Sequence, residues 1–403
     1  MKRAILGLAS VAAIFASCAK TEISEVNVNN PNVIGFEANT GKTRATTNDL
    51  AVIQANASGF GVYATNKTAP AVEFIANEGY KYNATKSAWE WDAANPFLWP
   101  TQNADYPINF YAYYPKSSAT LSTALTQSYS VADAPANQID YLAASKIGVV
   151  TRPTSSNIAL NFVHILSKID FKVITGAAVT VEVQSISARN IGNNGTFDFA
   201  GMAWSAAPTA FGRTSSYMTA TNPAPANINK FASTNATAVR GSSGSLMLMP
   251  QNLTARAWDK TVPVKASQSI IEVVYRVYET ASGKDVVGFS DASNHPDYAG
   301  SQAEAAGYTG PLFVKVAFSL NSNWLMGKNY TYTIYLGDPG TSGGNLIDDK
   351  QVDTGGKDTD LPVVDPGTGT TVTPPGPITD PNKPIGFIVT VDQWGNEPDI
   401  AIQ

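Results

Sequence analysis

The chain has 403 residues, of which 15% are charged, and a formal net charge of −5 at pH 7. This small negative charge provides no basic footprint for nucleic acid, and a single cysteine excludes a disulfide within the chain. Aromatic residues reach 10% beside abundant Thr, Ser, Asn, Ala and Gly, which is typical of extracellular β-structure. The length is enough for two ordinary domains.

The N-terminus has the features of an exported precursor. Residues 1–3 are positively charged, and residues 4–16 form an apolar stretch that is too short to span a membrane. The stretch ends in Phe15-Ala-Ser-Cys18, where small residues before the only cysteine are similar to a bacterial lipobox. We therefore expect a signal peptide over 1–17 and a lipid on Cys18. An ordinary signal peptide followed by an unused cysteine is the alternative.

A polar segment, residues 20–48, precedes the first long globular pattern. Its apolar interruption is Val33-Ile-Gly-Phe36, and Arg44 follows between small polar residues. An arginine in such a setting is the kind of exposed site that proteases cut, although most arginines are merely solvated. Cleavage of the Arg44–Ala45 bond would remove a propeptide, residues 18–44, together with its apolar strand.

Two groups of short apolar segments follow, and we expect two tandem β-sandwich domains at 45–175 and 176–337. The densest aromatic strand is Tyr106–Pro115, whose alternation puts Phe110 and Tyr111 on opposite sides. We expect its aromatic side chains to pack in the core, and a sugar-binding platform is the alternative. The other main segments are 60–63, 80–82, 89–91, 96–100, 138–144, 161–174, 179–186, 246–251, 270–278, 312–318 and 330–336.

No arrangement of residues in the chain is typical of a catalytic or metal site. The only histidines, His164 and His295, have no spacing that supports metal ligands, and we expect His164 to be a structural, hydrogen-bonded residue. The serines at 242–245 do not form a nucleophile elbow. A pair of glycosidase carboxylates would be visible only in the folded chain and stays open as a less favoured reading. We expect no enzyme, no metal and no cofactor.

The last twenty residues form an apolar strand pattern behind a segment of different composition. Residues 338–383 lack aromatic residues and are dense in Gly, Pro, Thr and Asp, which predicts a flexible linker. Within residues 384–403, apolar side chains recur at every second position, as in a strand with one apolar face. The apolar positions are Ile385, Phe387, Val389 and Val391, with Trp394 beyond them. Such a strand should fold back on its own chain or pair with another molecule, and we expect the second.

The tripeptide Ile-Gly-Phe occurs at both ends of the chain, at Ile34–Phe36 and at Ile385–Phe387. Both copies lie in an extended context, which suggests that both fit one groove, although a shared tripeptide can arise by coincidence. Loss of the first copy would leave unpaired sheet edges, which are a template for an added strand. We therefore expect Ile385–Trp394 to replace residues around Val33–Ala38 in a neighbouring molecule.

Six segments spread over nearly the whole chain carry a resemblance to a known family. They are the lipobox at Cys18, Lys42–Ala45, Phe162–Ile169, Leu248–Gln251, Asn323–Tyr332 and Phe387–Trp394. In this order they resemble the fimbrillin family, the major and minor pilins of the type V pili of Bacteroidales. The resemblance implies two transthyretin-like β-sandwich domains with a flexible C-terminal donor-strand appendage. It also implies export as a lipoprotein, cleavage by an arginine-specific protease, and polymerisation by strand exchange.

Carried over to this sequence, the resemblance implies a lipid on Cys18, a cleaved Arg44–Ala45 bond, and a donor strand over Ile385–Trp394. It implies other pilin subunits as partners, in a homo- or hetero-polymer. A host glycan or protein is a further partner that the sequence leaves open. The precursor would be an outer-membrane lipoprotein and the mature chain part of a cell-surface fimbrium. The resemblance leaves stalk, accessory, tip and anchor roles open. The alternative is an uncleaved, monomeric surface lipoprotein that binds glycan or host protein through its aromatic loops.

Overall fold

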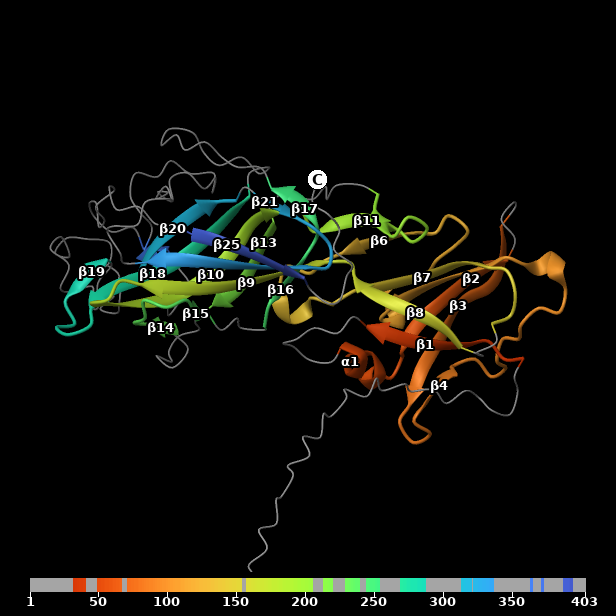
Figure 1. Cartoon of the computed structure of the whole chain (residues 1–403). Coiled ribbons are helices and arrows are strands. Elements are labelled where there is room, and N and C mark those ends of the chain that lie inside the picture. Colours follow the sequence, from red (N-terminus) through yellow and green to blue (C-terminus); the bar gives the residue numbers. More distant parts are fainter. Residues whose placement is uncertain are drawn as a thin grey trace, which may run out of the picture.

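The computed structural model describes residues 32–40, 49–66, 71–153, 157–205, 213–219, 229–239, 244–253, 269–287, 313–320, 322–336, 363–364, 371–372 and 387–393. In these residues the chain is all-β apart from helix α1 (Asp49–Ala55) and three 3-10 turns (Asn103–Asp105, Lys116–Ser118 and Pro135–Asn137). None of the described helices is long and apolar enough to cross a membrane. The strands form two lobes side by side, which confirms the predicted all-β sandwich class (Figure 1).

The N-terminal lobe contains a seven-stranded sheet in the order β1-β8-β7-β5-β2-β3-β4. Neighbouring strands are antiparallel, except that β1 and β8 run parallel. The alternation predicted for the aromatic strand is present, because Phe110 faces one buried cluster and Tyr111 faces another. The strands are β1 (Gly35–Thr40), β2 (Phe60–Asn66), β3 (Val72–Asn83), β4 (Ala88–Trp91), β5 (Ile108–Tyr114), β7 (Leu142–Val149) and β8 (Asn157–His164).

A small sheet covers the second face of this seven-stranded sheet. Its strands are β6 (Thr126–Ser130), β11 (Asn194–Asp198) and β12 (Ala203–Trp204), in the order β12-β11-β6. Phe197 and Phe199 from this region pack with Tyr111 and Tyr113 in one buried cluster. Because β11 lies in sequence between β10 and β13 of the C-terminal lobe, its pairing with β6 ties the two lobes together.

The C-terminal lobe is a sandwich of two larger sheets. One has the order β13-β10-β18-β20-β23-β24, with β14 and β19 beside it, and the other has the order β15-β9-β22-β25, with β16 beside it. Val183 and Val273 of the first sheet share a buried cluster with Phe171 and Tyr332 of the second. The strands are β9 (Ser167–Thr175), β10 (Val179–Ile191), β13 (Arg213–Thr219), β14 (Asn229–Phe231), β15 (Thr237–Ala238), β16 (Leu246–Leu248), β17 (Gln251–Leu253), β18 (Ile270–Glu279), β19 (Asp285–Val287), β20 (Phe313–Ser319), β21 (Ser322–Trp324), β22 (Lys328–Leu336), β23 (Val363–Val364), β24 (Thr371–Val372) and β25 (Phe387–Gln393).

The segment 161–174, which the sequence presents as one long strand, contributes to two strands in different lobes. Strand β8 ends at His164 in the N-terminal sheet, and β9 begins at Ser167 in the C-terminal lobe. Ile165 and Leu166 between them are fully buried, so the change of lobe occurs inside the protein. The sequence-based boundary at 175/176 assigns β9 to the N-terminal domain. Because β9 pairs with β22 and packs in the C-terminal core, we propose a boundary between β8 and β9.

Candidate functional site

Strand β1 lies at the end of the seven-stranded sheet, next to β8. On one side it pairs in parallel with β8, from Gly35 opposite Asn157 to Thr40 opposite Phe162 (Figure 1). On the other side, the Ile34 N–H donates to the Phe97 carbonyl over 2.8 Å and the Trp99 N–H donates to the Asn32 carbonyl over 2.8 Å. Residues 35–40 are therefore paired with β8, and residues 32–34 are hydrogen-bonded to the segment 97–99 on the other side. We call this position of residues 32–40 the β1 seat.

Two aromatic side chains complete the hydrogen bonding of the β1 seat. The indole N–H of Trp91 donates to the Ile34 carbonyl over 2.8 Å, and the Phe36 N–H donates to the Tyr80 hydroxyl over 3.2 Å. Burial raises the pKa of Tyr80 to about 12, although the hydrogen bond from Phe36 acts in the opposite direction. The phenol therefore stays neutral at physiological pH, and no buried charge is needed to satisfy the backbone of β1.

The inward side chains of β1 are part of the lobe's core. Ile34 is fully buried and Phe36 is 1% exposed. The Phe36 ring meets Tyr80, Trp91 and Phe110 edge-on, with ring centroids 5.3, 5.5 and 5.4 Å apart. Each large apolar side chain buried in this way contributes roughly 1.5–3 kcal/mol. The β1 seat is thus lined by buried apolar and aromatic side chains.

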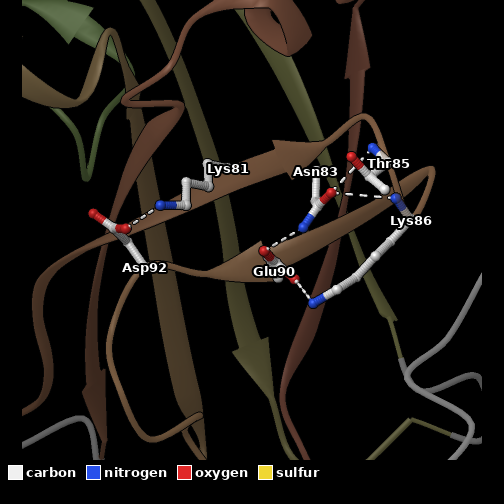
Figure 2. Close-up of polar contacts among 6 residues, drawn as sticks. All are labelled: Lys81, Asn83, Thr85, Lys86, Glu90 and Asp92. Carbon is white, nitrogen blue, oxygen red and sulfur yellow. Dashed lines mark hydrogen bonds and ion pairs between the residues drawn. The ribbon is translucent and has the colours of Figure 1, made fainter.

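The hairpin of β3 and β4 positions Tyr80 and Trp91 opposite each other. Its other face carries polar contacts that hold the tip of the hairpin together (Figure 2). The Asn83 amide and the Lys86 ammonium each donate to Glu90 over 2.8 Å, and these bonds lower the pKa of the Glu90 carboxyl. Lys81 pairs with Asp92 farther along the same face. Exposed pairs of this kind contribute little stability, and they lie on the face of the hairpin opposite Tyr80 and Trp91.

Strand β25 lies at the opposite lobe. It pairs with β22 of its own chain, antiparallel, from Phe387 opposite Ile334 to Gln393 opposite Lys328. Val389 and Val391 lie opposite Tyr332 and Tyr330 in this ladder. In this single chain the C-terminal strand therefore folds back, which is the first of the two alternatives that the sequence leaves open.

The structure places the predicted site residues in two separate regions. Val33, Ile34 and Phe36 fill the β1 seat, whereas Phe387, Val389 and Val391 lie on β25, so the two Ile-Gly-Phe segments are not brought together within one chain. Other predicted residues lie outside the described part of the chain: Cys18, Arg44, Ala45, Ile385 and Trp394. Arg44 falls between the end of β1 at Thr40 and the start of α1 at Asp49.

Sequence reasoning missed the residues that receive β1. Tyr80, Trp91 and Asn157 line the seat, but each belongs to a different part of the chain from the strand it contacts. The available signal was that Tyr80 and Trp91 alternate with Lys81 and Glu90, which predicts one wet and one buried face. This alternation predicts that Tyr80 and Trp91 are buried, but it does not predict that they contact β1.

His164 is held by a carboxylate inside the N-terminal lobe. His164 is buried, and its Nδ1 lies 2.9 Å from Asp140 Oδ1, which agrees with the predicted structural role. The described residues hold no group of three or more His, Cys, Asp or Glu arranged for a metal ion. Among the described residues, the β1 seat is therefore our candidate functional site, because it holds an extended apolar strand.

Comparisons with known proteins agree with this architecture. The model of a family described as fimbrillin-like matches residues 43–349, which is more than half of the chain. A fimbrial protein from Bacteroides vulgatus is similar in structure, with a TM-score of 0.56 and 15% identity, over 90% of this chain and 99% of that one. The tip fimbrial protein Mfa3 from Porphyromonas gingivalis, with a C-terminal truncation, has a TM-score of 0.36 and 10% identity, over 83% and 93% of the two chains.

None of the curated proteins has a sequence that matches this chain. The structural likeness supports the fold, and the match of the family model covers both lobes. The chain belongs to the fimbrillin-like family.

Proposed function

We propose that the chain is a pilus subunit that polymerises by donor-strand exchange and contributes to adhesion. In this proposal the precursor is exported as a lipoprotein anchored at Cys18 and is cut after Arg44 by an arginine-specific protease. The C-terminal strand of one subunit then occupies the β1 seat of the next. Membership of the fimbrillin-like family and the structural likeness to a fimbrial protein support the role of pilus subunit.

The observation that carries the proposal is the position of β1 in the lobe. The strand is buried and paired with β8, yet it comes before every other described element, and residues 41–48 connect it to α1. Those residues include Arg44. A single cut after Arg44 would therefore separate a core strand from its lobe and would fall between the described elements β1 and α1.

Cleavage would change how firmly β1 is held. In the uncut chain the strand and its seat belong to one molecule, so the strand rebinds at an effective concentration of the order of millimolar. After the cut, rebinding becomes bimolecular, and a diluted strand leaves. The vacated seat would expose the edge of β8 and the groove around Tyr80, Trp91 and Phe110, which favours a replacement strand.

The C-terminal strand fits the role of the replacement. Its apolar residues recur with the period of two that the inward side chains of β1 also follow. Residues 338–383, rich in Gly, Pro, Thr and Asp, would give it reach beyond its own lobe once the short strands β23 and β24 within them leave the edge of β20. Addition of the tail of one subunit to the seat of the next is a head-to-tail contact, which produces filaments and not closed dimers. Exchange requires β25 to leave β22 first, because one strand cannot occupy both places.

Limited proteolysis tests the proposal. Trypsin trimming of the purified precursor at Arg44 should convert monomers into a ladder of bands on a denaturing gel without boiling. The same trimming of a chain that lacks Ile385–Gln403 should give monomers only. A Lys42→Gln/Arg44→Gln double variant is the matched control and should stay monomeric after the same treatment, because trypsin cuts after lysine as well as after arginine. Ladders from the trimmed, tail-deleted chain would contradict donor-strand exchange.

One observation favours a second candidate, an uncleaved monomeric surface lipoprotein. Strand β25 pairs with its own chain over seven residues, which is what a chain that never exchanges its tail would show. The mass of the mature N-terminus separates the candidates. A chain that begins at Ala45 supports the pilus subunit, and a chain that retains lipid on Cys18 supports the monomer or an anchoring subunit, which the ladder test then distinguishes.

A further inference from the structure

We propose that the β1 seat binds only strands that carry a glycine at the position of Gly35. The seat would accept an extended segment of the form Ile-Gly-Phe, with the glycine opposite Asn157, and a second copy of this chain would supply it through Ile385-Gly386-Phe387. The inference rests on the proposed strand exchange and adds its register and its partner. It makes the chain self-complementary, so that it can form a polymer without another kind of subunit.

Gly35 is needed for space. It pairs with Asn157 at the start of β8, in extended backbone that any residue adopts. A Cβ added at Gly35 would meet the Oδ1 of Asn157 well inside van der Waals contact and would lie 3.5 Å from the Tyr80 hydroxyl. A strand with any larger residue here must push the Asn157 side chain aside.

The hydrogen bonds on either side of Gly35 fix the register. Trp91 donates to the carbonyl of the residue before the glycine, and Tyr80 accepts from the N–H of the residue after it. A slip of one residue would turn both backbone groups away and would move Phe36 from the core to the other face. The seat is therefore specific for three consecutive residues: an apolar residue, a glycine and an aromatic residue.

The tail of the chain matches these requirements in order. Ile-Gly-Phe occurs at two places in the sequence, at Ile34–Phe36 and at Ile385–Phe387. With Gly386 at the place of Gly35, Phe387 takes the place of Phe36 between the rings that line the seat. Farther along, Ile388 takes the half-buried place of Glu37, and Val389 takes the buried place of Ala38. The apolar period of the tail thus coincides with the inward period of β1.

A compensating pair of substitutions tests the register. In protein trimmed at Arg44 with its C-terminal tail intact, Gly386→Ala should slow ladder formation by about tenfold or more. The added methyl group would meet the Asn157 side chain of the receiving subunit. Asn157→Ala in the same chain should restore the rate to within about threefold of the unsubstituted protein. Gly395→Ala, in the same tail but beyond the tripeptide, should change the rate little, with or without Asn157→Ala.

The uncut precursor gives a second readout that does not depend on polymerisation. Gly35→Ala should lower its melting temperature, and Asn157→Ala should restore most of the loss. Suppose that trimmed protein forms ladders, but that Gly386→Ala does not slow them or Asn157→Ala does not restore the rate. The proposed register, with Gly386 opposite Asn157, is then wrong, although strand exchange itself is not contradicted. If the unsubstituted trimmed protein forms no ladders, the proposed function itself fails.

Discussion

Phe36→Ala in the uncut precursor is expected to lower the free energy of unfolding of the N-terminal lobe by about 3–5 kcal/mol. The ring is 1% exposed and contacts three other aromatic rings, so its removal leaves a cavity that rigid neighbours cannot fill. Denaturant unfolding followed by tryptophan fluorescence measures the loss, because Trp91 reports directly on this cluster.

Leu98→Ala provides the control for this substitution. Leu98 stands opposite Val33 in an isolated bridge, but its side chain is 50% exposed. We expect a change of about 0.5 kcal/mol or less, as for most exposed positions. If Phe36→Ala costs no more than Leu98→Ala, β1 is not an integral strand of the lobe, and its removal could not open an acceptor groove.

Val389→Asp is expected to abolish ladder formation by the trimmed protein. At the proposed register Val389 takes the place of Ala38, which is 3% exposed, and an unpaired carboxylate buried there costs several kcal/mol. Ile388→Asp places the same charge one residue earlier, where β1 already carries the half-buried Glu37. That variant should form ladders at a rate within about threefold of the unsubstituted chain.

The contrast between Val389→Asp and Ile388→Asp separates a specific strand from general stickiness of the tail. Both variants have the same net charge and lose one apolar side chain. Equal loss of ladders in both would show that the tail acts through its overall hydrophobicity. The opposite order, with Ile388→Asp the more harmful, would place the tail one residue out of the proposed register.

The sequence predicted most strands and the all-β class because alternation is a local property. The alternation of Phe110 and Tyr111 in β5 corresponds to two real clusters on the two faces of one sheet. Burial of the Val33–Phe36 segment could also be read from its apolar residues. Its partners, Tyr80 and Asn157, could not, because contacts between distant segments leave no trace in one sequence.

The break between β8 and β9, where the chain passes from one lobe to the other, could have been predicted from the sequence. In β8 the buried side chains are at even positions such as Phe162 and His164, and in β9 they are at odd positions such as Ile169 and Phe171. A change of parity inside an apolar run indicates a break, since each strand keeps one face to its core. The run through Ile165 and Leu166 hid the break because both residues are apolar and both are buried.

A cross-link between two differently substituted subunits tests the central claim most directly. In β1, Asn39 lies opposite Asn161, and at the proposed register Thr390 takes the place of Asn39. Thr390→Cys and Asn161→Cys would be placed on separate trimmed chains, which have lost Cys18, and the chains mixed under mild oxidation. The account predicts a disulfide between the two chains within the ladders, because paired positions of neighbouring strands bring two cysteines within bonding distance.

Val391→Cys with Asn161→Cys should give none, since those side chains point to opposite faces. Ladders without the first cross-link, or with both equally, would contradict the replacement of β1 by the tail of a second copy.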